Sequence, residues 1–206
     1  MTYTDFIYDF DGTIADSYPI FTESFVELLK EYGKNVTYDE AFALLKISVR
    51  AAVVAVGIDT DLKEFSDRYK DARHALMVKK GMPMYGAEQL LSFVKANGGR
   101  NYIYTHSPNY IWMLLETWGL KDYFEGGVTA DDHFPVKPAP DALNYMVETY
   151  RLDRTKTLMI GDRDIDIDAG HRAGIKGVLL DPDGFYADYS PDFRVHSLPE
   201  ICDLVI

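Results

Sequence analysis

Short runs of apolar residues recur along the chain, and each run stops at polar or turn-forming residues. Four of these runs predict strands: Phe6–Tyr8, Tyr102–Tyr104, Thr157–Ile160 and Gly177–Leu180. All four are short and rich in aliphatic or β-forming residues, so they are expected to lie buried in one sheet.

Apolar residues at helical spacing occupy intervals between these strands. Residues 88–96 and 107–118 each carry an apolar stripe on one helical face. In the second stretch, Ser107 is the expected N-cap and Pro108 the first helical residue. Alternating strands and helices predict an α/β fold with a parallel sheet, in which ligands bind at the carboxyl ends of the strands.

Residues 16–81 interrupt this alternation, because they contain helical patterns and no convincing strand. A first helix is expected to end at Gly33, and a capping box at Thr37 and Glu40 starts a second. A longer helix is expected to end at Gly81. Residues 16–81 are therefore expected to form a small helical domain, inserted into a domain made of residues 1–15 and 82–206.

The composition is that of a soluble globular protein, with 47% apolar and 26% charged residues among 206. The 33 acidic and 21 basic side chains give a net charge of −12. This charge repels the phosphate backbone of nucleic acids and anionic lipid surfaces, so neither nucleic acid nor membrane is an expected partner. An acidic protein that handles anionic substrates needs a metal ion.

The sequence predicts a cytoplasmic protein. Its first residues lack the basic and apolar regions of a secretory signal. The most apolar window, Ala51–Ile58, is too short to span a bilayer, which needs about 20 residues. The single cysteine, Cys202, can form neither an internal disulfide nor a thiolate metal cluster, which suits a reducing compartment.

Two carboxylates follow the first predicted strand, in the segment Asp9–Thr13. Asp9 and Asp11 are spaced so that both can face one cleft, and Gly12 lets the turning backbone present N–H groups to an anion. Negative charge concentrated in this way calls for a cation. Taken alone, the segment is also compatible with an Asp-Gly turn whose carboxylates are solvated.

Polar side chains follow two other predicted strands. Thr105 and Ser107, with His106 between them, combine a hydroxyl group with the start of a helix, an arrangement that binds anions. Further along the chain, Lys137 precedes two prolines that restrict the local backbone. Alternating acids then follow the strand at 157–160: Asp162, Asp164 and Asp166.

Calcium binding is a second interpretation of these alternating acids. An EF-hand loop counted from Asp162 needs Gly at its sixth position and Glu at its twelfth. Ile167 and Ala173 occupy these positions, so the EF-hand interpretation fails.

In this order and spacing, the residues at the strand ends resemble the four signature motifs of the haloacid dehalogenase-like hydrolase superfamily: Asp9 with Asp11, Thr105, Lys137 and Asp162. The resemblance covers the whole chain, and the phosphoglycolate phosphatase and β-phosphoglucomutase types are the nearest. It implies a Rossmann-like parallel-sheet core, residues 1–15 and 82–206, with a small all-helical cap domain over residues 16–81.

The resemblance implies a catalytic role for each motif. Asp9 is the expected nucleophile that forms an aspartyl-phosphate, and Asp11 is the expected acid and base for the leaving oxygen and the attacking water. Thr105 and Lys137 are expected to bind the transferring phosphoryl group. Because the dehalogenases of the family lack the second acid, Asp11 favours phosphate chemistry.

The same resemblance implies a Mg²⁺ site and substrate contacts. Asp9, Asp162 and the backbone carbonyl of Asp11 are the expected ligands, and Asp166 is expected to bind directly or through water. The expected substrate-binding residues of the core are Gly12, Thr13, His106 and Ser107. For His106, the sequence leaves a packing role open as the alternative.

The expected cap domain carries candidate specificity residues. The segment Lys46–Arg50 resembles the one through which mutase-type members contact a substrate phosphate, and Arg50 is suited to hold an anion through two hydrogen bonds. The alternative interpretation is that Lys46 and Arg50 are exposed cations on a helix. Phe21 stands where the mutases carry a histidine, which favours hydrolysis.

The sequence therefore predicts a Mg²⁺-dependent phosphatase that hydrolyses a small phosphorylated metabolite through an aspartyl-phosphate. A sugar-phosphate mutase of the same superfamily, a phospho-accepting signalling module and a non-catalytic binding protein are the alternatives. The physiological substrate, the oligomeric state and the role of the tyrosine-rich segment Phe185–Phe193 stay open at this point.

Overall fold

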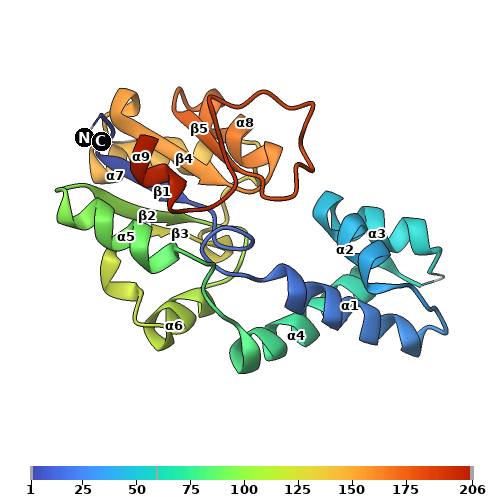
Figure 1. The fold of residues 1–206 in the computed structure, drawn as a ribbon. Helices are drawn as coiled ribbons and strands as arrows, with labels where there is room; N and C mark the ends of the chain where they lie inside the picture. The colour runs from blue at the N-terminus through green and yellow to red at the C-terminus, as the bar shows by residue number, and fades with distance from the viewer. Residues whose placement is uncertain (1, 59, 205–206) are drawn as a thin grey trace. The chain divides into compact units, whose positions relative to one another are not determined.

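The computed structural model describes residues 2–58 and 60–204. Within them, six strands form one parallel sheet in the order β3-β2-β1-β4-β5-β6 (Figure 1). The strands are β1 (Asp5–Tyr8), β2 (Arg100–Tyr104), β3 (Phe124–Val128), β4 (Thr157–Gly161), β5 (Lys176–Leu180) and β6 (Phe193–Val195). The α/β fold class and the parallel sheet predicted from the sequence are confirmed.

The pattern of apolar residues in the sequence does not predict two of these strands, β3 and β6. The strand β3 contains Gly126 and Gly127, which are poor strand formers. At Gly127, a Cβ atom would lie 2.4 Å from the carbonyl oxygen of Ile103, so close packing against β2 requires glycine there. The strand β6 has only three residues. Both lie at the edges of the sheet, where the apolar signal is weakest.

Helices cover both faces of this sheet. They are α5 (Ala87–Ala96), α6 (Tyr110–Thr117), α7 (Asp141–Tyr150), α8 (Asp164–Arg172) and α9 (Glu200–Leu204), with short 3₁₀ turns at Lys121–Tyr123, Ala130–Asp132 and Arg154–Lys156. Residues of α7 and α8 pack with Tyr102, Tyr104 and Met159 in one buried apolar cluster. On the opposite face, α5 lies beside α9 (Figure 1), and Asn101 of β2 donates a hydrogen bond to the Leu91 carbonyl of α5.

The start of α6 differs from the prediction. The helix begins at Tyr110, after an N-cap at Asn109, and not at Ser107 and Pro108. The reason is that Ser107 is used elsewhere: its backbone N–H donates to Thr105 Oγ1 at 3.0 Å, and its hydroxyl donates to Asp11. The residues between β2 and α6 therefore form a turn that reaches the end of β1.

The chain divides into two compact units, one formed by residues up to Ala15 and from Pro83 onward, the other by Asp16–Met82. The second unit consists of α1 (Tyr18–Glu31), α2 (Tyr38–Ile47), α3 (Val49–Val56) and α4 (Leu62–Lys80). That this unit acts as a cap stays a prediction. Among the described residues, no helix combines the length and the apolar character that crossing a membrane requires. The cytoplasmic location also stays a prediction.

Aromatic residues form the core of the helical unit. The Phe25 ring contacts those of Phe65 and Tyr69 edge-on, with centroids 5.8 and 5.5 Å apart. The Tyr69 hydroxyl donates to the Phe21 carbonyl at 2.9 Å and so links α4 to α1. The expected capping box at Thr37 and Glu40 is confirmed, because each side chain bonds the other residue's backbone N–H.

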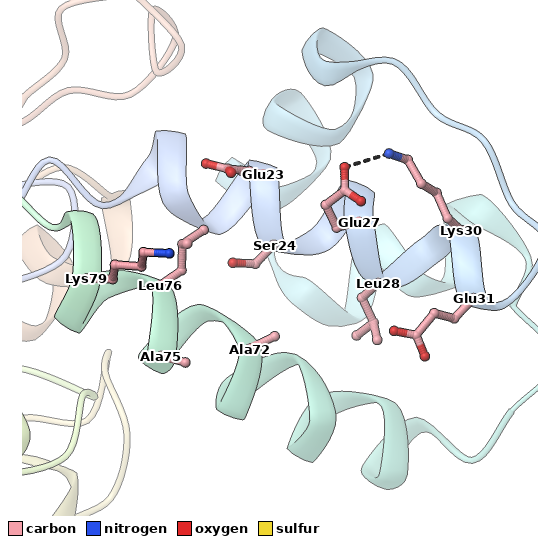
Figure 2. A pocket seen from close by; sticks show the side chains of 10 residues that line it. All are labelled: Glu23, Ser24, Glu27, Leu28, Lys30, Glu31, Ala72, Ala75, Leu76 and Lys79. Carbon is pink, nitrogen blue, oxygen red and sulfur yellow. Dashed lines mark hydrogen bonds and ion pairs between the residues drawn. The ribbon is translucent and has the colours of Figure 1, made fainter.

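A groove of about 550 Å³ runs along the surface of this unit between α1 and α4 (Figure 2). Its floor includes Leu28, Ala72 and Leu76, and charged side chains surround it. In Figure 2, Lys30 donates to Glu27 on the same helix. Glu23, one of the lining residues, pairs with the Lys80 ammonium at 2.7 Å.

Candidate active site

The carboxyl ends of β1 and β4 bring Asp9 and Asp162 together. The two strands are hydrogen-bonded neighbours, and the backbone N–H of Asp9 donates to the Ile160 carbonyl at 2.8 Å. Asp9 and Asp162 are both buried, and each follows its strand directly. The sheet topology therefore produces the pair of acids that the sequence shows 153 positions apart, at 9 and 162.

Three buried acids and one buried lysine form the centre of the site. A carboxylate oxygen from each of Asp9, Asp162 and Asp166 lies within 4.8 Å of the other two. The Lys137 ammonium donates to Asp9 Oδ1 and Asp166 Oδ1, both at 2.8 Å. Its third hydrogen bond, at 2.9 Å, goes to the Tyr104 carbonyl at the end of β2. The ammonium group thus makes three hydrogen bonds within the site.

The burial of this cluster changes the proton affinity of its members. Burial raises the pKa of Asp9, against the opposing effect of Lys137. Burial likewise raises the pKa of Asp166 to about 6, again opposed by Lys137. Burial alone would lower the pKa of Lys137, but Asp166 and Asp9 outweigh it and raise that pKa. Lys137 therefore remains protonated at neutral pH.

The cluster fits a divalent cation such as Mg²⁺. Hard cations take carboxylate oxygens as ligands, and buried acids need a positive charge beyond the single one that Lys137 supplies. A further polar atom, Asp11 Oδ1, is buried and has no hydrogen-bond partner among the described residues. Asp9 and Asp162 are the residues that would hold the ion.

Asp166 has a second task besides any contact with a metal. Its Oδ1 accepts from Lys137, and its Oδ2 accepts the backbone N–H of Arg163 at 3.1 Å. It lies so close to Gly161 that a Cβ atom there would meet its carboxylate at 2.4 Å. Asp166 thus holds the ammonium of Lys137 in place, while its role as a metal ligand stays a prediction.

The turn after β1 differs in detail from the expected anion cradle. Gly12 adopts a φ of 76°, as its position in the turn demands. Its N–H donates to the Ala15 carbonyl at 2.9 Å, and the N–H of Thr13 donates to the Phe10 carbonyl at 3.3 Å. These two N–H groups close the turn rather than remaining available for an anion. A contact of Gly12 or Thr13 with substrate stays a prediction.

The loop after β2 connects Asp11 to Lys137. The Ser107 hydroxyl donates to Asp11 Oδ2 at 2.5 Å. The backbone N–H of Lys137 donates to His106 Nε2 at 2.9 Å. Burial, helped by the charges of Lys137 and Arg163, lowers the pKa of His106 to about 3, so the ring is neutral and can accept this bond. His106 therefore has a structural contact, and its contact with substrate stays a prediction.

The sequence does not predict two features of the site. It names Ser107 as a helix cap and a substrate-binding residue, but its bond to Asp11 is not predicted, because the 96-residue separation hides that contact. The sequence pattern does not single out Arg163, although it is the one basic residue in the acidic stretch Asp162–Asp168. That isolated positive charge is the signal by which Arg163 could have been found.

The candidate residues of the helical unit have different surroundings. Lys46 is buried, and its ammonium lies 3.9 Å from the centroid of the Tyr18 ring. The interpretation of Lys46 as an exposed cation is therefore wrong. Arg50 is exposed and lies in the first turn of α3. Substrate binding by Lys46 or Arg50 stays a prediction.

Comparison with known proteins agrees with this geometry. The model of the haloacid dehalogenase-like hydrolase family matches residues 6–180. The pyrophosphatase PpaX of Halalkalibacterium halodurans is 26% identical over 97% of this chain and 95% of its own. The fructose-1-phosphate phosphatase YqaB of Escherichia coli is 30% identical over 85% of this chain and 95% of its own.

A solved structure supports the fold. The crystal structure of a putative phosphoglycolate phosphatase from Lactobacillus plantarum superposes with a TM-score of 0.82. It is 22% identical, and the match covers 99% of this chain and 100% of the other. From the family match and the fold, the chain belongs to the haloacid dehalogenase-like hydrolases and is an enzyme of that family.

Proposed function

We propose that the protein is a Mg²⁺-dependent phosphatase that hydrolyses a small phosphate monoester through an aspartyl-phosphate on Asp9. The observation that carries the proposal is the buried Lys137 ammonium between Asp9 and Asp166. A buried lysine this close to a carboxylate favours its ionised form and fixes its orientation, as a nucleophile requires. The names of both curated relatives describe enzymes that act on small phosphate compounds.

The first half of the reaction transfers the phosphoryl group to Asp9. The Asp9 oxygen attacks phosphorus, and the bond from phosphorus to the ester oxygen breaks. Lys137 and the hydroxyl of Thr105 are the groups proposed to bind phosphoryl oxygens. Bound Mg²⁺ would neutralise charge on the phosphoryl group, held by Asp9 and Asp162.

Asp11 is the proposed proton donor and acceptor. Its Oδ2 is held by the Ser107 hydroxyl, while its Oδ1 has no hydrogen-bond partner among the described residues. The free oxygen suits a carboxyl group that gives its proton to the leaving oxygen. In the second half, a water molecule loses a proton to Asp11 and attacks the aspartyl-phosphate, which releases inorganic phosphate.

Hydrolysis is favoured over a mutase reaction by Phe21. This residue stands where the mutase-type members carry a histidine, and its phenyl ring cannot exchange protons with a reacting group. Phe21 is buried in the helical unit, with the Arg73 guanidinium 4.6 Å from its ring centroid. We propose that Arg50, exposed on α3, helps to hold the substrate.

The test is phosphate release from a panel of small phosphate monoesters, with Mg²⁺ and after chelation with EDTA. We expect turnover with Mg²⁺, loss of turnover with EDTA, and loss of turnover in Asp9→Asn. Asp164→Asn is the matched control, because Asp164 is an acid at the start of α8, between Asp162 and Asp166 in the chain, that lies outside the buried cluster. Full activity of Asp9→Asn would contradict the nucleophile, and phosphorylation without turnover would favour a phospho-accepting module.

A further inference from the structure

Tyr104 is the last residue of β2 and directly precedes Thr105, one of the groups proposed to bind the phosphoryl oxygens. It is 2% exposed and packs in the buried apolar cluster with Val128 of β3 and Met146 of α7. Close packing of this kind restricts the ring to one orientation. A large aliphatic residue could fill the same space, so packing by itself assigns no role to the aromatic ring.

The Lys137 ammonium lies over the face of the Tyr104 ring. Its Nζ atom is 4.5 Å from the ring centroid, within the distance of about 6 Å at which an aromatic face attracts a cation. The same ammonium donates to the Tyr104 carbonyl at 2.9 Å. Since the side chain of Lys137 is 2% exposed, water does little to weaken the attraction. Tyr104 therefore contacts Lys137 through both its backbone and its side chain.

The Tyr104 ring also borders the group that bonds the backbone of Lys137. His106 Nε2 accepts the Lys137 backbone N–H at 2.9 Å. The rings of Tyr104 and His106 meet edge to face, with centroids 6.2 Å apart and an angle of 83° between their planes. One aromatic ring thus lies beside the charged end of Lys137 and beside the imidazole that bonds its backbone.

The hydroxyl group of Tyr104 is not what connects this residue to Lys137. Its Oη atom is buried and has no hydrogen-bond partner among the described residues. Burial raises the pKa of Tyr104 to about 12, against the opposing charge of Lys137, so the hydroxyl stays protonated at neutral pH. The side chain consequently adds no negative charge to a cluster that already contains three acids.

From these contacts we infer that Tyr104 is a positioning residue for Lys137, and that the face of its aromatic ring performs this role. The ring holds the ammonium where it meets Asp9 and where, in the proposed reaction, it binds the transferring phosphoryl group. The inference rests on the proposed phosphatase function and adds to it a residue outside the four sequence motifs.

An aromatic face suits a lysine that exchanges partners during a reaction. The ammonium donates to Asp9, Asp166 and the Tyr104 carbonyl, so binding a phosphoryl oxygen redistributes these bonds. A hydrogen bond weakens steeply when its angle changes, whereas the attraction to a ring face tolerates rotation of the ammonium. A further carboxylate would also attract Lys137, but its charge would compete for the metal ion and repel the phosphoryl group.

Two substitutions separate the ring from the hydroxyl group. Tyr104→Phe keeps the ring face, so kcat/KM for 4-nitrophenyl phosphate with Mg²⁺ should stay within about twofold of that of the unmodified enzyme. Tyr104→Leu removes the ring and keeps the carbonyl that bonds Lys137, and kcat/KM should fall about tenfold. Because leucine is also smaller, its effect alone does not distinguish the electrons of the ring from its packing.

A fluorinated series makes that distinction. Phenylalanine and its monofluoro, difluoro and trifluoro derivatives are introduced at position 104 by reassignment of a stop codon. Fluorine withdraws electron density from the ring face and weakens its attraction for a cation, while the size of the ring changes little. We expect kcat/KM to fall stepwise with each fluorine atom, by about tenfold over the whole series. A ring that only fills space would show no such trend.

Phe6 is the matched control position. It is fully buried on β1, and its ring stacks on that of Tyr8 with centroids 6.5 Å apart. Across residues 2–58 and 60–204, no lysine or arginine lies over its ring. The same derivatives at position 6 should therefore leave kcat/KM within about twofold. Urea denaturation checks that each variant is folded under the assay conditions.

Four results would overturn the inference. Equal kcat/KM values across the fluorinated series at position 104 would show that the ring only fills space, while the phosphatase function would stand. A trend of the same size at position 6 would trace the effect to fluorine in the core and not to Lys137. A loss in Tyr104→Phe as large as that in Tyr104→Leu would make the hydroxyl the working group. Phosphate release from no ester by the unmodified protein would remove the proposed function and this inference together.

Discussion

The cluster around Lys137 and the charged rim of the groove between α1 and α4 contain the same kinds of side chain in opposite surroundings. In the cluster, the side chain of Lys137 is 2% exposed and lies 2.8 Å from Asp9 and Asp166. At the rim, Lys80 and Glu23 form an ion pair of similar length, 2.7 Å, with about half of each side chain exposed. The bond lengths alone do not distinguish the two regions.

Exposure to solvent determines how strongly each ion pair contributes to stability. Two exposed charges gain little from each other, because water already solvates them and salt screens them. Buried charges lose that solvation and depend on their partners, so removing one partner is costly. Burial also shifts proton affinity, as the pKa of about 6 for Asp166 shows. The comparison shows that the burial of a charged side chain indicates a functional role better than the length of its ion pair does.

Removing Lys137, the cation of the buried cluster, should have the largest effect on stability and on activity. Lys137→Met leaves Asp9 and Asp166 without their shared partner, and breaking a buried pair costs about 3–5 kcal/mol. We expect the free energy of unfolding from urea denaturation to fall by this amount, and phosphate release to fall at least about 100-fold. Lys79→Met, at the groove, is the matched control and should cost less than about 0.5 kcal/mol. Equal losses in the two variants would refute the comparison.

Filling the space beside Asp166 should have the next largest effect on the free energy of unfolding. At Gly161, an added methyl group would lie 2.4 Å from the Asp166 carboxylate. Gly161→Ala should therefore displace Asp166 and destabilise the protein by about 1–3 kcal/mol, as overpacking does. A double-mutant cycle with Asp166→Gly checks the cause, because a Cβ at Gly161 would meet both the Cβ and the carboxylate of Asp166 at 2.4 Å. If the cost is unchanged when the whole Asp166 side chain is absent, the clash is not the reason.

A pH series tests the neutral ring of His106. Its pKa is about 3 in the folded chain, below the value near 6.5 of an unfolded histidine. The unfolded chain therefore takes up the proton first on acidification, so the contribution of His106 to stability is complete above about pH 6.5 and declines as the pH falls towards 3.

His106→Gln should flatten this part of the stability curve, because glutamine can accept the Lys137 N–H without titrating. The measurement is the free energy of unfolding between pH 7 and 4.5 for both proteins. Since His106 is an exposed residue, we expect a shallower slope than that of a fully buried imidazole. Parallel curves for the two proteins would show that the ring is free to protonate.

The smallest effect is expected at the groove. Lys80→Ala removes the exposed ion pair with Glu23 and should change the free energy of unfolding by less than about 1 kcal/mol. In 1 M NaCl, where the screening length is about 3 Å, the difference should shrink further. A loss comparable to that of Lys137→Met would show that exposure is a poor guide to the energy of these pairs.

Local sequence patterns predicted the centre of the sheet and the helical unit well. The strands β1, β2, β4 and β5 have strong apolar runs, and the capping box of α2 is a local signal. The edge strand β3 was missed because its glycines serve packing against a neighbour and carry no apolar pattern. The need for glycine in β3 arises only when β2 packs beside it, so it cannot be recognised from the sequence of β3 alone.

The contacts of the site could be anticipated only through the family resemblance. Lys137 meets Asp9 across 128 positions of the chain, and nothing near Lys137 in the sequence indicates that it is buried. The same holds for Ser107 and Asp11, where a local rule favoured a helix cap. The periodicity of apolar residues predicts which face of a helix or strand is buried. Contacts between side chains far apart in the sequence depend instead on the order of the strands in the sheet.

The place of β1 in the sheet has a consequence for synthesis on the ribosome. This strand is made first, yet its two neighbours are β2 at residues 100–104 and β4 at residues 157–161. The helical unit, Asp16–Met82, is one continuous compact segment, so all residues of that unit are translated before β2. The apolar strand β1 therefore stays unpaired on its β4 side until residues 157–161 have been translated. The charged and turn-forming residues that follow it, Asp9 to Gly12, are well placed to keep that waiting strand from associating with other nascent chains.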